Sequence, residues 1–154
     1  MPARIDILAV GSLSSHIRPA FEHYLRLLAG GVTVNVREVR EVALRGRSEA
    51  EVLREEARRL MPALGAGGVL VALDIGGREY DSPALAAKLQ EWFARGGVTF
   101  VVGGSLGLGD EIAQRADESL SLSKLTLPHQ LARVVLAEQL FRALKIARGE
   151  KYHH

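Results

Sequence analysis

The amino-acid sequence predicts one α/β domain, spanning residues 1–154, with a mostly parallel β-sheet covered by helices on both faces. Apolar runs of strand length alternate along the chain with stretches whose apolar residues repeat at helical spacing, the order of a βαβ architecture. Three of these runs are almost continuously apolar, as strands buried on both faces must be. A length of 154 residues suits a single core, since two domains would each be short of one.

Five segments are predicted strands. Segments 5–10, 69–75 and 98–102 are the nearly continuous apolar runs and belong in the middle of the sheet. Segment 32–39 reads VTVNVREV and alternates between apolar and polar residues, which predicts a strand toward an edge with one face in water. Segment 119–122 is a weaker candidate.

Helices are predicted in the gaps between these strands. Serine and aspartate favour the N-cap of a helix, proline is tolerated at its first position, and glycine favours its end. The predicted helices are 16–28, one from a Ser48 cap to about Leu64, one capped by Ser82 with Pro83 at its first position, a short one capped by Asp110, and one from about Pro128 to Gly149.

The composition excludes several classes of protein. Apolar residues make up 47% and charged residues 25%, which is typical of globular domains and not of disordered tails, fibres or coiled coils. The absence of cysteine excludes disulfides, thiol nucleophiles and cysteine-based metal sites, and the five histidines form no metal motif. No apolar run approaches the roughly 20 residues of a membrane helix. Without a signal-peptide pattern, we expect a cytoplasmic protein that binds neither metal nor membrane.

The charge is small but unevenly distributed. The formal net charge is +2, from 20 Lys and Arg against 18 Asp and Glu. Residues 121–154 hold six cations and two acids, a net +4, so the first 120 residues carry −2. This basic end is either an RNA-facing surface or a solvated helix face.

Three segments leave predicted strands at their carboxyl ends, where open parallel sheets bind ligands. They are 73–77 (LDIGG), 103–109 (GGSLGLG) and 120–129 (LSLSKLTLPH). Glycines bring the backbone close to a ligand, but the loop matches neither GxGxxG nor a P-loop, and a structural turn would also explain it. The third segment is either an edge strand feeding a helix or a stretch whose unpaired backbone groups bind a purine ring.

The last predicted helix, 129–147, is apolar around most of its circumference, with 12 apolar residues among 19. A helix of this kind is buried on more than one side, which predicts a second subunit and hence a homodimer. The charges of Arg133, Glu138 and Arg142 on this helix are expected to be paired or functional. Among the histidines, His129 at the start of the helix is the best functional candidate.

Four stretches together resemble the RlmH family of small SPOUT-class methyltransferases, which act on 23S ribosomal RNA. They are VALDIGGREYDSPALAAKLQEW, FVVGGSLGL, SLSKLTLPHQLARVVLAEQLFRALKI and GEKYHH, and the resemblance extends over the whole chain. It implies a SPOUT α/β fold with a deep C-terminal trefoil knot, and a homodimer. It also implies methyl transfer from S-adenosyl-L-methionine to N3 of a pseudouridine in the assembled ribosome.

The resemblance implies roles for individual residues. Leu73 matches the position that lines the adenosine pocket, and the paired glycines match backbone that faces the cofactor. The implied cofactor-binding residues are Leu73, Gly103, Gly104, Leu122, Ser123, Lys124, Leu125, Thr126 and Leu127. The implied catalytic and substrate-side residues are His129, Arg133, Tyr152 and His153.

One departure from the family pattern concerns the glycine loop. The family usually reads GGPEG or close to it, whereas this chain reads GGSLG, so Ser105 and Leu106 replace a proline and a carboxylate. A contact made by that carboxylate is then either lost or rebuilt elsewhere in the chain.

The resemblance suggests a mechanism. We hypothesise that His129 or His153 assists loss of the N3 proton, because an unperturbed histidine titrates near neutrality. Arg133 and Arg142 would hold phosphate or the developing oxyanion, and Tyr152 would stack on the base. Two other functions are considered: a different α/β nucleotide-cofactor enzyme such as a dehydrogenase, and a non-catalytic ribosome-binding dimer of the same fold.

Overall fold

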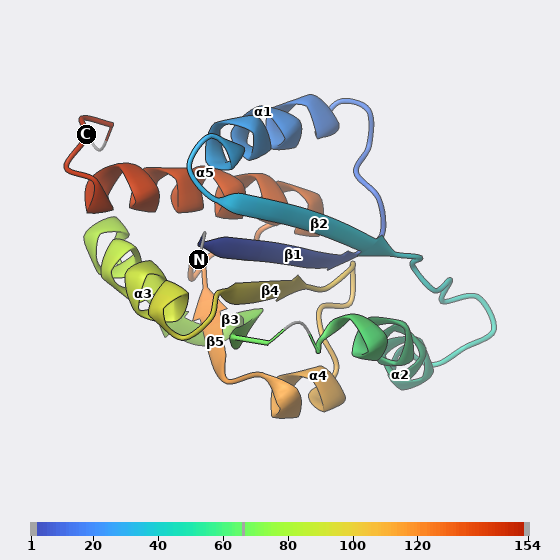
Figure 1. Ribbon diagram of the computed structural model, residues 1–154. Helices are drawn as coiled ribbons and strands as arrows, with labels where there is room; N and C mark the ends of the chain where they lie inside the picture. The colour runs from blue at the N-terminus through green and yellow to red at the C-terminus, as the bar shows by residue number, and fades with distance from the viewer. Residues whose placement is uncertain (1–2, 66, 153–154) are drawn as a thin grey trace.

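The computed structural model describes residues 3–65 and 67–152, and its centre is a five-stranded parallel sheet (Figure 1). The strand order is β2-β1-β4-β3-β5, and every neighbouring pair is parallel. The strands are β1 (Arg4–Val10), β2 (Thr33–Val39), β3 (Val69–Glu79), β4 (Val98–Val102) and β5 (Glu118–Ser121). The predicted parallel α/β fold is confirmed, with the alternating segment at one edge and the weak segment at the other.

Helices cover both faces of the sheet (Figure 1). One face carries α1, α3 and α5, and the other carries α2 and α4. The bounds are α1 (Arg18–Ala29), α2 (Glu49–Leu60) continued by the single 3-10 turn η1 (Met61–Ala63), α3 (Ser82–Ala94), α4 (Asp110–Arg115) and α5 (His129–Ala147). Among the described residues, no helix is both long and apolar enough to cross a membrane.

Each face of the sheet has its own hydrophobic core. The larger core lies under α1, α3 and α5, where Trp92 meets Phe100 edge-on with ring centroids 5.7 Å apart. The smaller core lies under α2 and α4 and includes Leu60 and Ile112. Because β1, β3 and β4 are buried between these cores, their near-continuous apolar sequences are explained.

The helix caps agree with the sequence in part. Ser48 caps α2 in a capping box with Glu51, as predicted. The Ser82 cap is wrong: Asp81 is the N-cap of α3 and accepts a hydrogen bond from Ala84 N at 2.8 Å. Both side chains suit a cap, and Ser82 instead donates to Gln139 on α5 at 2.7 Å. The cap predicted at Asp110 is also wrong by one residue, since Gly109 holds that position.

Helix α5 lies between α1 and α3 and packs against the sheet (Figure 1). This arrangement accounts within one chain for most of the apolar circumference that the sequence attributed to a second subunit. Leu131 is the large apolar residue of α5 that stays exposed, at 42%. The homodimer therefore stays a prediction, as does the trefoil knot.

Candidate active site

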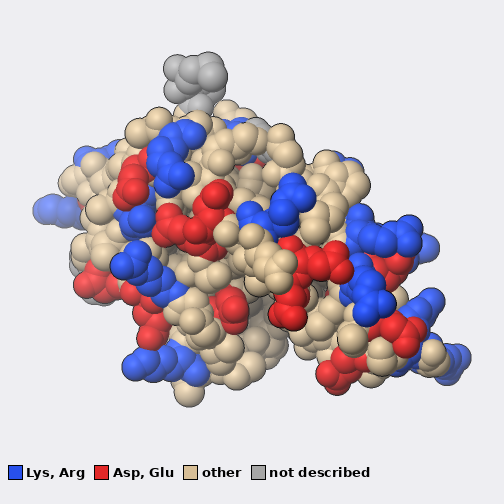
Figure 2. Space-filling view, turned by 90° about the horizontal axis from the view of Figure 1, so that it is seen from below, with Lys and Arg blue, Asp and Glu red and all other residues tan. Residues whose placement is uncertain are grey.

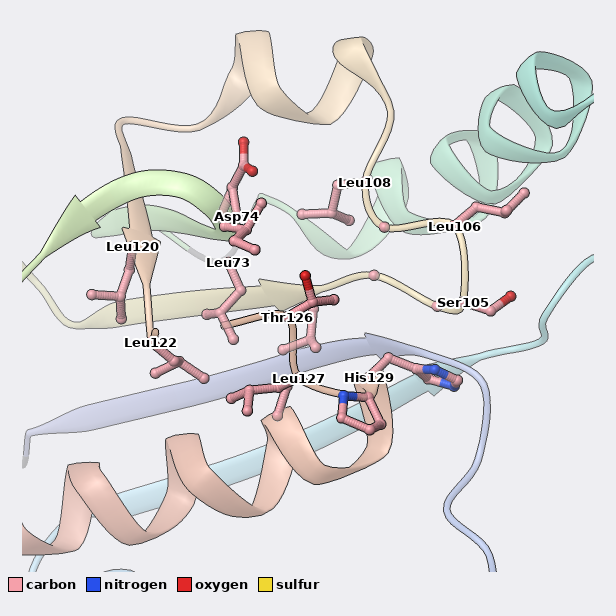
Figure 3. A pocket seen from close by; sticks show the side chains of 18 of the residues that line it. Leu73, Asp74, Ser105, Leu106, Leu108, Leu120, Leu122, Thr126, Leu127 and His129 are labelled. Carbon is pink, nitrogen blue, oxygen red and sulfur yellow. The ribbon is translucent and has the colours of Figure 1, made fainter. Parts of the chain in front are cut away.

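A cavity of about 660 Å³ opens at the carboxyl ends of β3, β4 and β5 (Figure 3). Its walls come from the three strand-end segments that the sequence identified. They include residues 72–75 within β3, residues 102–108 at and after the end of β4, and residues 125–129 before and at the start of α5. The volume lies in the range typical of small-molecule sites, about 300–1,000 Å³.

A bulge at the end of β3 shapes one wall. Leu73 and Arg78 both pair with Leu120 of β5, so the four residues between them leave the ladder. Asp74 turns this excursion by accepting a hydrogen bond from Gly76 N at 3.0 Å. Leu73 and Asp74 are thereby held at the cavity (Figure 3).

The glycine loop after β4 forms a second wall, and its first two positions leave little room for a side chain. A Cβ on Gly103 would overlap the backbone of Gly107, and a Cβ on Gly104 would lie 3.1 Å from Val10 Cγ1. Gly107 has φ +77°, and its N–H donates to Gly104 O at 3.0 Å. The loop is therefore both a tight turn and a stretch of bare backbone facing the cavity.

The stretch between β5 and α5 forms the third wall. Its turn is held by Ser121 Oγ, which donates to Ser123 O at 2.9 Å, and by Leu125 N, which donates to Ser123 Oγ at 2.9 Å. Apart from bonds within the sheet ladder and the helices, the described residues 122–128 make one backbone–backbone hydrogen bond, from Ala132 N to Pro128 O. Leu122, Thr126 and Leu127 come together around the cavity (Figure 3). Backbone groups outside any ladder can accept and donate bonds to a ligand.

The structure brings together most of the residues implied as cofactor-binding. One implied residue, Lys124, lies outside the cavity, where its side chain is 86% exposed and its Nζ is 3.9 Å from Glu79. Those that line the cavity are Leu73, Gly103, Gly104, Leu122, Ser123, Leu125, Thr126 and Leu127. His129, the first residue of α5, also lines it, on the side of Ser105 and Leu106 (Figure 3).

Arg133 lies one turn further along α5 and is fully buried. Its guanidinium donates to Glu38 Oε2 at 2.5 Å, to Val10 O at 2.9 Å and to Gly11 O at 2.5 Å. It is not among the cavity-lining residues. The expectation that its charge is paired is confirmed, as it is for Arg142, which donates to Glu138 Oε2 at 3.0 Å.

Tyr152 lies at the other end of α5 from His129. Its ring meets Phe141 edge-on at 4.9 Å, its hydroxyl donates to Glu138 Oε2 at 3.1 Å, and the Arg142 guanidinium lies over its face. Burial, together with the Glu138 carboxylate, raises the pKa of the Tyr152 phenol. A 19-residue helix is about 28 Å long, so one chain does not bring Tyr152 to its own cavity. His153 lies outside the described residues.

Several cavity residues were not predicted individually. Asp74, Leu106 and Leu108 line the cavity, and Glu41 lies beside it, accepting a hydrogen bond from Ser105 Oγ at 3.3 Å. The first three belong to strand-end segments that the sequence did identify. Glu41 follows β2, and no local pattern marks it.

Among the Asp, Glu, Lys and Arg residues that the structure describes, the cavity lining contains an acidic side chain and no basic one. None of the described residues that line it is Lys or Arg, and Asp74 is the lining carboxylate. Within the described part of the chain, no group of three or more His, Cys, Asp or Glu is placed to hold a metal ion. The arrangement suits a ligand that carries positive charge and a flat apolar group.

Comparisons with known proteins agree on one family. A family model described as "Predicted SPOUT methyltransferase" matches residues 3–153. The chain is similar to the Ribosomal RNA large subunit methyltransferase H of Rubrobacter xylanophilus, with 49% identity over 157 residues that cover 99% of each chain.

Solved structures share the fold at low sequence identity. A probable methyltransferase from Bordetella pertussis Tohama I matches with a TM-score of 0.62 and 14% identity, over 92% of this chain and 95% of that one. The SpoU methyltransferase AviRb from Streptomyces viridochromogenes, in complex with the cofactor AdoMet, matches with a TM-score of 0.51 and 17% identity, over 96% of this chain and 60% of that one.

The parallel sheet and the glycine-lined cavity at its carboxyl edge define a methyltransferase fold of the SPOUT class. The chain belongs to the SPOUT methyltransferase family and, within it, to the RlmH group that its sequence resembles.

Proposed function

We propose that the protein transfers a methyl group from S-adenosylmethionine to N3 of a pseudouridine in 23S rRNA, on assembled ribosomes and as a homodimer. The observation that carries the proposal is the cavity itself. At the carboxyl edge of the sheet it brings together the glycine loop, the 122–127 stretch and His129. The chain's relative in Rubrobacter xylanophilus is named a large-subunit rRNA methyltransferase.

The cavity fits S-adenosylmethionine. Glycine at 103 and 104 permits the tight turn that forms one wall, because a Cβ on Gly103 would overlap the Gly107 backbone and one on Gly104 would crowd Val10. Leu73, Leu122 and Leu127 supply apolar surface for a purine ring, and the backbone of 122–127 supplies its hydrogen-bond partners. The absence of Lys and Arg from the described lining suits a sulfonium cation. When bound, this cofactor supplies an electrophilic methyl group and requires no metal.

His129 is our candidate for the group that accepts the proton. Its ring lies at the cavity rim, and an imidazole nitrogen is a suitable acceptor for the N3–H proton of the target base. Replacing both His129 and His153 with alanine is expected to slow single-turnover methyl transfer, and an unchanged rate would exclude this acid–base role. The predicted phosphate or oxyanion contacts of Arg133 and Arg142 stay predictions. In this structure Arg133 holds the start of α5 to β1, so we assign it a positioning role.

The homodimer explains how Tyr152 reaches a substrate. The cavity and the tail lie at opposite ends of α5, so a tail that covers a cavity would come from the second subunit. Three apolar side chains, two that line the cavity and one on α5, are exposed and available to receive that subunit. They are Ile75 at 55%, Leu125 at 77% and Leu131 at 42% exposure.

Recognition of the ribosome by shape fits the charge distribution. Four of the six cations in residues 121–154 contact carboxylates of the same chain: Lys124, Arg133, Arg142 and Lys145. On the α2 and α4 side, basic and acidic side chains are interspersed rather than gathered by sign (Figure 2). We therefore expect weak binding to isolated rRNA fragments, whereas tight, salt-insensitive binding to a short hairpin would contradict this proposal.

The proposal is tested with purified protein, S-adenosylmethionine labelled in the methyl group, and ribosomes from a host that lacks this gene. Nucleoside mass spectrometry of the 23S rRNA is expected to find labelled N3-methylpseudouridine, with much less label in protein-free rRNA. Cofactor binding without any transfer to rRNA would refute the proposed substrate. Ribosome binding without cofactor binding would instead indicate a non-catalytic module.

A further inference from the structure

A second, smaller cavity of about 240 Å³ adjoins the first, and we call it the annex. The two cavities share Ser105 and Leu106 of the glycine loop. The other wall of the annex comes from residues 41–44, which follow β2, and from Val52 of α2. Its volume is below that of a typical cofactor site and suits a single planar ring.

The wall formed by residues 41–44 is irregular in backbone but held by several hydrogen bonds. Arg59 Nη1 donates to Arg40 O at 2.8 Å, and Arg47 Nη1 donates to Ala43 O at 2.9 Å. Val42 N donates to Glu56 Oε2 at 3.0 Å. A loop held at three backbone positions presents its remaining side chains in a fixed arrangement.

Glu56 shows that this wall lies in the same electrostatic environment as His129. Its side chain is buried, and burial raises its pKa, although the hydrogen bond from Val42 N–H opposes this increase. The charge of Glu41 raises that pKa further, and His129 lowers it. Glu41 on the annex wall and His129 at the first cavity therefore both act on the Glu56 carboxylate.

Glu41 is the carboxylate of the annex. Its Oε1 accepts a hydrogen bond from Ser105 Oγ at 3.3 Å. It also faces bare backbone, because a Cβ on Gly104 would lie 3.8 Å from Glu41 Oε1 and one on Gly11 would lie 3.7 Å from Glu41 Oε2. The glycine loop of this chain has Ser105 and Leu106 where its family has a proline and a carboxylate, and Glu41 brings a carboxylate back to that loop from another segment.

We propose that the annex receives the target nucleobase and that Glu41 accepts a hydrogen bond from its ring N1–H, a substrate-recognition role that rests on the proposed function. Pseudouridine is joined to ribose through carbon, so N1–H is free, whereas N1 of uridine carries the ribose. A carboxylate is an acceptor only, and it therefore favours the base with the additional N–H donor. Val42, Leu44 and Leu106 supply apolar contacts for the faces of the ring.

Enzymes that modify a base take it out of its stack and read its edges in a pocket beside the reacting group. The annex is placed for this because Ser105 and Leu106 border both cavities, so the two lie on either side of the same loop residues. With N1–H at Glu41, N3 lies two ring positions away and is available to the neighbouring cavity. The amino group of the cofactor is a competing occupant, because it also donates N–H bonds.

The test compares Glu41→Ala and Glu41→Gln with wild type on two kinds of ribosome, one with pseudouridine and one with uridine at the target. Wild type is expected to methylate the pseudouridine ribosome faster. Loss of a hydrogen bond to a charged group is expected to reduce that preference by about 10- to 100-fold in Glu41→Ala and by less in Glu41→Gln. Glu111→Ala, which removes an exposed carboxylate on α4, is the matched control and is expected to keep the preference.

Calorimetric titration of S-adenosylmethionine separates the two occupants. An unchanged Kd in Glu41→Ala, with the preference for pseudouridine lost, supports the proposal. A raised Kd would place the carboxylate on the cofactor and overturn it. Equal slowing on both ribosomes, or no slowing, would also overturn it. If wild type methylates neither ribosome, the proposed function itself fails, and that failure is visible without any variant.

Ala43→Trp provides a second variant that does not alter Glu41. Ala43 lines the annex and is exposed, so an indole there fills the annex without entering the core. We expect this variant to unfold at a temperature close to that of wild type and to bind S-adenosylmethionine with an unchanged Kd. We expect its rate of methylation to be strongly reduced. Methylation at the wild-type rate with the annex filled would overturn the proposal.

Discussion

The guanidinium of Arg133 on α5 and the carboxylate of Glu38 on β2 form an ion pair, with Nη1 and Oε2 2.5 Å apart. The same guanidinium holds the carbonyl groups of Val10 and Gly11 at the end of β1. It thereby fixes the start of α5 to the carboxyl edge of the sheet. His129 owes its place at the cavity rim to this anchor.

Replacing Arg133 is therefore expected to destabilise the fold. In Arg133→Leu the two carbonyls and Glu38 lose their donor, at a cost of about 3 kcal/mol in the free energy of unfolding. Arg133→Lys keeps the charge but not the planar fork that reaches several acceptors, so a loss of about 1–2 kcal/mol is expected. Urea unfolding can be followed by the fluorescence of Trp92, the single tryptophan. Wild-type stability in Arg133→Lys would contradict the anchoring role.

Gly103→Ala is expected to abolish cofactor binding, because the new Cβ would overlap the backbone of Gly107 and open the loop. Forcing one methyl group into such a space costs about 1–3 kcal/mol. Gly65→Ala is the control, since a Cβ there meets nothing within 4 Å. Calorimetric titration with S-adenosylmethionine measures both. Equal affinities in the two variants would show that the glycine loop does not shape the cofactor site.

Glu118 is expected to make stability depend on pH in the acid range. Burial alone would raise its pKa, but the hydrogen bond from Trp92 Nε1 at 2.9 Å and the charge of Lys88 lower it below the ordinary value. A lowered pKa stabilises the fold above the unfolded-state pKa of about 4.3, and this contribution is lost as pH falls through the folded-state pKa.

The stability difference between wild type and Glu118→Gln is therefore expected to be about 1 kcal/mol at pH 7 and to shrink below pH 4. Urea unfolding at a series of pH values measures this difference, with Glu111→Gln as a control on the exposed surface. A difference that stays constant from pH 7 to pH 3 would show that the charge of Glu118 contributes nothing.

If the tail of one subunit serves the cavity of the other, two inactive variants are expected to restore each other. Gly103→Ala damages the cavity and Tyr152→Ala damages the tail. In a heterodimer with a two-fold axis, the intact cavity of one subunit meets the intact tail of the other, so about half of the wild-type activity per dimer is expected. Co-expression followed by a methylation assay measures it. An inactive mixture, with the heterodimer present, would mean that each tail serves its own subunit.

The local sequence pattern was sufficient to predict the strands, the helices and the segments that form the walls of the first cavity. Near-continuous apolar runs located β1, β3 and β4, and their carboxyl ends located Leu73, Gly103 and Gly104. These features depend on residues that are close together in the sequence. The conformational and burial preferences of such residues do not depend on which distant segment packs against them.

Contacts between distant segments could not be predicted in the same way. Arg133 and Glu38 are 95 residues apart and Ser105 and Glu41 are 64 apart, and neither pair leaves a pattern in either segment. The apolar circumference of α5 was explained by a second subunit, whereas α1 and α3 cover it within the chain. A sequence shows that a helix is buried, but not which partner buries it.

The most direct test of the central claim is nucleoside mass spectrometry of 23S rRNA from cells with and without this gene. We expect N3-methylpseudouridine to be present with the gene, absent without it, and restored by the wild-type chain but not by Gly103→Ala. The same amount of N3-methylpseudouridine in cells with and without the gene would contradict it.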